Sequence, residues 1–350
     1  KNHSALLSDK EPKAELTDQG ESRHSLRTKL LISFLLVSLM PLALLAYLDV
    51  KASRKALAGQ AFQALSAAAS QSSVRLDAFI DSNLETIDAE SKLPALRQYL
   101  SLSKDQRSDA ANTTQILNIL NSFVTKNPVF ICSYALLNAK GASLVDTEAG
   151  MVVRDLSERS YFREAMLTGL PWVSAVEFSN ENASAYLYFS APVTHQNGRT
   201  VGVLRAKYSA AVLQQILMKD TGLAGDLSFP ILLDERDLIL GYAGLPHAAA
   251  EDLRFSPLST LSAGEIAALK DKRRLPLSWK ERELTGFGQL AEALSSSESL
   301  LTFTLDAPDG GTMAASVARM SANPWRIVFV VPQKVFLAPV RSQIKKMLVF

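Results

Sequence analysis

The segment DLSERSYFREA, residues 155–165, places Arg159 two positions before Tyr161 at the start of an expected helix. A guanidinium can bind a carboxylate through two parallel hydrogen bonds, and neighbouring aromatic rings lower the local dielectric, which strengthens those bonds. The N-terminus of a helix adds a partial positive charge that favours an anion. The alternative is structural, because Asp155 with Glu158 has the spacing of a capping box and the aromatic residues fit a buried stripe.

Two later segments, AYLYFSAP and VLRAKYS, are expected to be strands. Side chains at alternate positions of a strand share a face, so Tyr186 and Tyr188 lie together, as do Arg205 and Lys207. A tyrosine offers both an apolar ring and a hydroxyl group. If these faces line a pocket, they supply aromatic surface, hydrogen bonds and positive charge.

The composition excludes several classes of protein. The 350 residues include 37 basic and 35 acidic side chains, a formal charge of +2, so no strong field is available to concentrate nucleic acid, and we expect no nucleic-acid partner. Cys132 is the single cysteine and cannot form an intrachain disulfide. Its apolar surroundings favour a small core residue over a nucleophile.

No catalytic motif is visible. The sequence contains no GxSxG, HExxH or GxxxxGK[ST] motif and no cysteine paired with a histidine. The four histidines lie in a polar tail, beside an apolar run or in expected turns: His3, His24, His195 and His247. The basic segment KDKRRLPLSWKERE is expected to be an isolated surface loop. We therefore expect no enzyme activity, cofactor or metal site here, while a catalytic output domain beyond residue 350 stays open.

The strongest single signal is an apolar run over residues 30–48 that carries no charge between Lys29 and Asp49. A helix of this length rises about 1.5 Å per residue and can cross a hydrocarbon core of roughly 30 Å. We expect a transmembrane helix over residues 29–49, preceded by a disordered cytoplasmic tail over residues 1–28. A signal peptide is the alternative, although its apolar core is usually about 7–15 residues long and ends at small residues.

The C-terminal sequence QIKKMLVF adds an apolar run that has only begun. We expect residues 336–350 to be a helix entering a second membrane span, with an ordinary apolar C-terminus as the alternative. Residues 50–343 would then be periplasmic. The segment would cross the inner membrane once, and the full protein twice.

Between the membrane segments, the pattern predicts an α+β fold. Residues 50–127 are expected to form a long helix and helical stalk, because apolar residues recur there every three or four positions. After Pro128 the period becomes that of strands. A hairpin, a helix and a three-stranded meander are expected over residues 128–220, and a looser version follows over residues 221–335. A helix of about 40 residues needs support, from the later modules or from a second copy of the chain.

This arrangement resembles the double Cache sensor domains of bacterial receptors, which have PAS-like antiparallel-sheet modules. The resemblance covers roughly residues 49–343. It is carried by RSYFREA at 159–165, SAPV at 190–193, NG at 197–198, VGVL at 201–204 and PWR at 324–326. It implies an extracytoplasmic sensor that acts through chemotaxis, a two-component system or another output, with a small-molecule pocket in the membrane-distal module. The candidate ligand-binding residues are Arg159, Tyr161, Trp172, Glu177, Tyr186, Tyr188 and Lys207.

The sequence departs from the amino-acid-binding pattern of that family. Where the pattern has an aspartate and a tyrosine that hold the ligand's ammonium group, this chain has Lys207 and a position near Glu177. A lysine does not attract an ammonium group, so a pocket with Arg159 and Lys207 would favour an anion such as an organic acid. A structural ion pair between Lys207 and Glu177 is the alternative.

The predicted function is therefore the ligand-sensing input region of a membrane receptor that forms a homodimer and signals through helix displacement. The alternative is a protein-interaction or dimer-bracing module without a small-molecule ligand.

Overall fold

A computed structural model describes residues 26–107, 109–151, 154–179, 184–244, 253–280, 288–295, 302–306, 311–340 and 342. The chain divides into two units, Lys1–Ser53 and Arg54–Phe350. The expected disordered tail falls mostly on residues 1–25 and the expected second span mostly on residues 343–350. Both of these segments lie outside the described residues.

The first unit contains the apolar part of helix α1, Leu26–Ser91, which continues through Pro41. Large apolar side chains such as Leu30, Phe34 and Leu45 are exposed there. Among the described helices, α1 is the one that is long and apolar enough to cross a membrane. The span expected over residues 29–49 lies within it.

In the second unit, α1 presents a buried stripe. Leu65, Ala69, Leu76, Ile80 and Ile87 are each at most 1% exposed. Their spacing of four and seven residues places them on one face of the helix. This face packs against both sheets of the protein, so one helix supports the whole unit.

Shorter helices follow α1. They are α2, Pro94–Ser101, α3, Lys104–Arg107, and α4, Ala110–Val124. Helix α4 lies within the helical stalk expected over residues 50–127, and Asp109 caps it by accepting a hydrogen bond from the Ala111 amide at 3.1 Å. Helix α2 is not predicted; it begins with Pro94 at its first position, where the missing amide costs nothing.

The first sheet has the order β2-β1-β6-β5-β3, with β4 also paired to β5, and is antiparallel throughout. We call the part of the chain from β1 to β6 the first module. Its elements are β1, Ile131–Asn138, β2, Ser143–Asp146, α5, Ser160–Thr168, β3, Trp172–Val173, β4, Glu177–Phe178, β5, Ala185–Thr194, and β6, Thr200–Ser209. The expected hairpin, helix and meander are confirmed.

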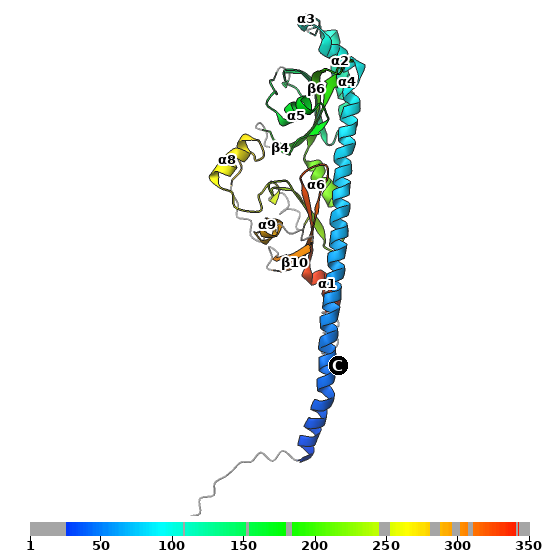
Figure 1. Cartoon of the computed structure of the whole chain (residues 1–350), viewed down its shortest axis with the longest axis vertical. Coiled ribbons are helices and arrows are strands. Elements are labelled where there is room, and N and C mark those ends of the chain that lie inside the picture. The colour runs from blue at the N-terminus through cyan, green and yellow to red at the C-terminus, as the bar shows by residue number, and fades with distance from the viewer. Residues whose placement is uncertain are drawn as a thin grey trace, which may run out of the picture. The chain divides into compact units, whose positions relative to one another are not determined.

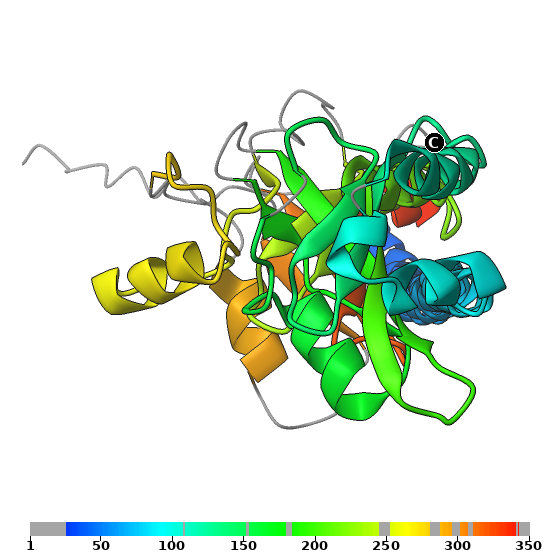
Figure 2. The same ribbon diagram turned by 90° about the horizontal axis from the view of Figure 1, so that it is seen from above.

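The two faces of this sheet have different neighbours. Leu187, Phe189 and Leu204 join the core against the long helix, whereas Tyr186 and Tyr188 pack with α5. The strand alternation predicted from the sequence is therefore correct. Figure 1 shows α5 and α1 on opposite sides of the first sheet, and Figure 2 shows the same layers from above.

The second module runs from β7 to β11 and has the order β8-β7-β11-β10-β9, again antiparallel. Helix α6, Ala211–Met218, connects the two modules. The later elements are β7, Phe229–Leu233, β8, Ile239–Tyr242, α8, Ala263–Asp271, α9, Gly288–Ser295, β9, Thr302–Asp306, β10, Thr312–Arg319, β11, Arg326–Pro332, and α10, Gln333–Phe336. Trp325, just before β11, is 1% exposed and is a packing residue, as expected.

Buried carboxylates attach α1 to the loops around it. Asp77 accepts hydrogen bonds from the Ser321 amide at 3.0 and 3.1 Å, the Ser321 hydroxyl at 2.9 Å and the Ala322 amide at 2.9 Å. Asp220, fully buried after α6, accepts a hydrogen bond from the Ser72 hydroxyl at 2.7 Å and forms an ion pair with Arg75. The helix is thus tied to the second module and to the connection between the modules.

One structural alternative and one expectation from the sequence are wrong. Asp155 does not cap helix α5, which begins at Ser160 with Arg159 at the N-cap position; the Asp155 carboxylate instead accepts a hydrogen bond from the Ser157 amide at 3.0 Å. Cys132 is exposed and not a core residue. The register between β1 and β6 shifts at this position, so Cys132 is the extra residue of a bulge.

Candidate ligand-binding site

A cavity of about 300 Å³ lies in the first module, on the face of the sheet that α5 covers. Its lining is rich in positive charge, with five basic and two acidic residues. The lining residues are Glu148, Met151, Arg154, Asp155, Leu156, Arg159, Tyr161, Ser179, Tyr188, Arg205, Lys207 and Arg273. The size fits a small organic molecule.

Strand β6 places two cations in the cavity. Arg205 is 2% exposed; its guanidinium donates to Asp146 at 2.6 Å and to the Ser133 hydroxyl at 2.9 Å. Burial lowers the pKa of Arg205, but Asp146, Tyr161, Tyr188 and Glu148 together outweigh that effect and the pKa is raised. Arg205 is therefore a permanent positive charge inside the protein.

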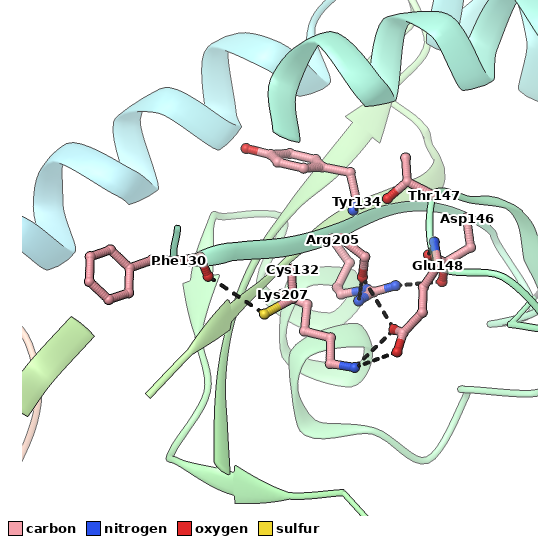
Figure 3. Close-up of polar contacts among 9 residues, drawn as sticks. Phe130, Cys132, Tyr134, Asp146, Thr147, Glu148, Arg205 and Lys207 are labelled. Atoms are coloured by element: carbon pink, nitrogen blue, oxygen red, sulfur yellow. Dashed lines mark hydrogen bonds and ion pairs between the residues drawn. The ribbon is translucent and has the colours of Figure 1, made fainter. Parts of the chain in front are cut away.

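Lys207 lies two positions further along β6, on the same face. Its amino group donates to both carboxylate oxygens of Glu148, at 2.8 and 2.9 Å, and lies 4.0 Å from the centre of the Tyr186 ring. Figure 3 shows Arg205 and Lys207 extending toward Asp146 and Glu148, which come from the end of β2 and the loop after it. The Glu148 carboxylate is the more exposed of these two acids.

Arg159, at the N-cap of α5, forms an ion pair with Glu177 of β4, which also accepts a hydrogen bond from the Ser160 hydroxyl at 3.0 Å. The Arg159 guanidinium lies over two neighbouring rings, 5.5 Å from the centre of Tyr161 and 5.7 Å from that of Tyr188. The ring centres are 4.7 Å apart. Burial raises the pKa of both tyrosines, so their hydroxyl groups stay protonated and can donate hydrogen bonds.

Two cavity cations retain hydrogen-bond capacity. The Nε atoms of Arg159 and Arg205 are buried, and neither has a hydrogen-bond partner among the described residues. A buried donor without an acceptor is costly, so such groups are rare in proteins. A ligand that carries acceptor oxygens would supply what these residues lack.

A close backbone contact positions the loop between β2 and α5. Gly141, in the turn of the β1–β2 hairpin, has φ +84°, and a Cβ atom there would lie 2.5 Å from the Cα of Ser157. The Leu156 amide donates to the Gly141 carbonyl at 2.9 Å, and the Ser143 amide donates to the Arg154 carbonyl at 3.0 Å. Glycine is therefore needed for the loop to lie against the hairpin and line the cavity.

The structure brings four of the seven predicted site residues together: Arg159, Tyr161, Tyr188 and Lys207 all line the cavity. Glu177 forms an ion pair with Arg159, and the Tyr186 ring contacts the amino group of Lys207, but neither Glu177 nor Tyr186 is part of the lining. Trp172, on the edge strand β3, is 39% exposed and is not part of the lining. The alternative ion pair between Lys207 and Glu177 is not formed, because each residue has another partner.

Several lining residues were not predicted. Glu148 and Arg154 lie in the loop after β2, where no periodic pattern indicates which side chains turn inward. Arg273 comes from the basic segment that the sequence indicates as an isolated surface loop, and this expectation is wrong. The neighbouring Arg274 has a side chain only 10% exposed and forms ion pairs with Asp234 and Glu235. Among the described residues, no group of three or more His, Cys, Asp or Glu side chains could hold a metal ion.

A long helix that carries two antiparallel-sheet modules, with a charged cavity in the first, defines a tandem-module α+β domain. A family model described as Cache domain, of the double-Cache type, matches residues 52–340. This match covers most of the chain, and the chain therefore belongs to the Cache domain family. The fold and family expected from the sequence are confirmed.

Solved structures agree with this assignment. The chain is similar to the sensor domain of the V. cholerae histidine kinase DctB, with 13% identity and a TM-score of 0.60 over 80% of this chain and 98% of that one. It is also similar to the ligand-binding domain of the Campylobacter jejuni chemoreceptor Tlp3 in complex with L-valine, with 11% identity and a TM-score of 0.54 over 81% and 97% of the two chains. Identities this low show a shared fold. No curated protein sequence matches the chain.

Proposed function

We propose that this chain is the extracytoplasmic, ligand-sensing input region of a transmembrane receptor, and that the cavity of the first module binds a small anion that carries a carboxylate. Membership of the Cache family supports the sensing role. The apolar part of α1 supports attachment to a membrane.

The observation that carries the anion proposal is the charge of the cavity. Five basic residues line it against two acidic ones, and Arg159 and Arg205 each keep a buried Nε donor that has no partner in the part of the chain that the structure describes. A carboxylate can accept hydrogen bonds from a guanidinium in a well-defined geometry, and the lower dielectric of a partly buried site strengthens that interaction. The neighbouring Tyr161 and Tyr188 rings add apolar surface and hydroxyl donors.

The relatives support a ligand with a carboxylate, whereas the residues of this chain argue against an ammonium group. Solved complexes of Tlp3 contain L-valine or isoleucine, molecules with both charges. In this chain, Lys207 and Arg205 stand on the inner face of β6 and lack affinity for an ammonium ion. Glu148 and Asp155 are the lining acids, and Glu148 is already paired with Lys207.

Signalling in this proposal passes through α1. Its buried stripe contacts both sheets, so a change in the first module on ligand binding would shift the helix. A homodimer in which two copies of α1 move against each other would pass the shift to the membrane. Such a switch requires only that the ligand binds one helix arrangement more tightly than the other. The partners are thus the ligand, the membrane and a second copy, with no role for nucleic acid.

The test is a thermal-shift screen of the full 350-residue chain in detergent micelles. The probes are lactate, pyruvate, succinate and glutamate, with putrescine, histamine and adenine as compounds of other chemistry. At 100 times its dissociation constant a ligand stabilises by about 2.7 kcal/mol, which is readily measured. We expect a carboxylate to raise the melting temperature of the wild type and of Arg163→Ala, a variant of the exposed arginine on the same helix, but not of Arg159→Ala.

Stabilisation by the amines alone would contradict the charge argument. If no compound of the panel and of a wider library of carboxylates changes the melting temperature, the small-molecule proposal is wrong and a protein partner is favoured.

A further inference from the structure

The cavity of the first module is lined in part by the second module. Arg273 comes directly after α8, which lies between β8 and β9 in the sequence, yet it shares the lining with Arg159 and Arg205. Figure 1 shows α8 next to β4. The other lining residues all come from the first module, and a residue of the second module completes the cavity.

Backbone and ring contacts hold this junction together. The Phe178 amide, at the end of β4, donates a hydrogen bond to the Arg273 carbonyl at 2.7 Å. The Phe178 ring packs edge-on against Phe255 of the second module, with ring centres 4.7 Å apart. Because Glu177, the partner of Arg159, precedes Phe178 on the same short strand, β4 connects this junction to the cavity.

The position of Arg273 is set by the second module. Its backbone has φ +57°, a conformation rare outside glycine, and the residue stays in it because its neighbours are anchored. The Arg274 amide donates to the Leu269 carbonyl at 2.7 Å, and the Arg274 guanidinium contacts Asp234 and Glu235 in the turn after β7. These contacts fix the backbone at Arg273, which lines the cavity of the neighbouring module.

Arg273 also differs in charge balance from the other cavity cations. Arg159, Arg205 and Lys207 each form an ion pair with a carboxylate of the first module. In the part of the chain that the structure describes, no carboxylate forms such a pair with Arg273. Among the described residues, its charge is therefore the one of these four that no carboxylate offsets in an ion pair.

We propose that Arg273 contacts the bound anion, so that the ligand links the two modules and tightens the contact between β4 and the segment after α8. This inference rests on the proposed function. It assigns to the ligand a second effect besides its action on α1: occupancy of the cavity controls how firmly the second module holds the first.

The first test is the affinity of the tightest-binding carboxylate of the panel, measured by isothermal titration calorimetry on the full chain in micelles. Arg273→Asn removes the charge and keeps a residue that tolerates positive φ, and Arg273→Lys keeps the charge. We expect Arg273→Asn to weaken binding about tenfold, with partial recovery in Arg273→Lys and no change in Lys272→Ala, an exposed neighbour of the same charge. An unchanged melting temperature without ligand shows that the variants are folded.

The second test is hydrogen exchange at the Phe178 amide, the donor of the junction's backbone hydrogen bond. The carboxylate should slow this exchange in the wild type and in Lys272→Ala, but not in Arg273→Asn, which retains the backbone acceptor. If the carboxylate binds all three proteins equally and leaves this amide unaffected, Arg273 is only a surface charge and the inference fails while the proposed function stands. If no carboxylate binds even the wild type, the proposed function fails and takes the inference with it.

Discussion

At the scale of single residues, the cavity combines fixed cations with carboxylates that compete with any anionic ligand. Arg205 is buried and Arg159 is half-buried, and they pair with Asp146 and Glu177, whose side chains are at most 8% exposed. Burial raises the pKa of Asp146 more than Arg205 lowers it. These two pairs shape the site, while Glu148, a third exposed, is the acid that a ligand could displace.

Glu148→Gln should therefore increase the affinity for the carboxylate about tenfold, or about 1.4 kcal/mol, because it removes a negative charge and frees Lys207. Calorimetric titration of the variant against the wild type measures the change. Glu158→Gln, which removes an exposed carboxylate outside the lining, serves as the control and should bind as the wild type does. Weaker binding in Glu148→Gln would mean that Glu148 contacts the ligand as an acceptor.

Alternation explains which site residues the sequence reveals. Tyr188 and Lys207 lie on regular strands, where a period of two decides which side chains share a face. Arg159 stands out because it precedes two aromatic residues. Glu148 and Arg273 lie in loops, whose side-chain directions depend on long-range contacts such as the one between Phe178 and Arg273. No local pattern encodes those contacts.

At the scale of secondary-structure elements, the turn of the β1–β2 hairpin supports the cavity loop. Gly141 and Gly198 form a natural comparison, since both have positive φ, +84° and +81°, in hairpin turns. A Cβ on Gly141 would meet the Ser157 backbone at 2.5 Å, whereas nothing lies within 4 Å of one on Gly198. Alanine substitutions at the two positions therefore distinguish the cost of a positive φ from the cost of a steric clash.

Gly141→Ala should destabilise the protein by about 3 kcal/mol and weaken ligand binding, because it adds a clash to the cost of a left-handed alanine. Gly198→Ala should cost about 1 kcal/mol and leave binding unchanged. Chemical denaturation and calorimetry of both variants measure the two effects. Equal losses in the two variants would show that the contact between the hairpin and the loop is unimportant.

Element type was predictable where the pattern is regular. The long α1, the α4 helix and both meanders follow from period and turn residues. The start of α5 was not, because the spacing of Asp155 and Glu158 imitates a capping box while Asp155 in fact closes a turn with Ser157. Short-range signals of this kind are compatible with more than one local structure. Here the antiparallel β-bridge between Ala142 and Asp155 keeps Asp155 outside the helix.

At the scale of the whole molecule, Asp77 joins α1 to the second module through the backbone amides of Ser321 and Ala322. Asp77→Ala should destabilise the protein by about 2 kcal/mol, because it leaves these amides without their acceptor. The control is Asp81→Ala, an exposed carboxylate one turn further along the same helix. Denaturation midpoints compare them, and an Asp77→Ala variant as stable as Asp81→Ala would show that this attachment contributes little.

The sequence predicts two tandem modules on a long helix, since each module has its own hairpin and meander. It does not predict how the modules meet. Arg273 and Phe178 are 95 residues apart in the chain, and their contact depends on the placement of α8, a placement that no sequence pattern indicates. The composition of the cavity is for this reason a property of the assembled protein.

The most direct test of the central claim is a calorimetric comparison of one carboxylate with its methyl ester on the wild-type chain. The two ligands have nearly the same shape and differ in charge. If the cavity recognises an anion through its guanidinium groups, the acid binds and the ester binds at least about 100-fold more weakly, a difference of about 2.7 kcal/mol. Equal binding of acid and ester would contradict the account.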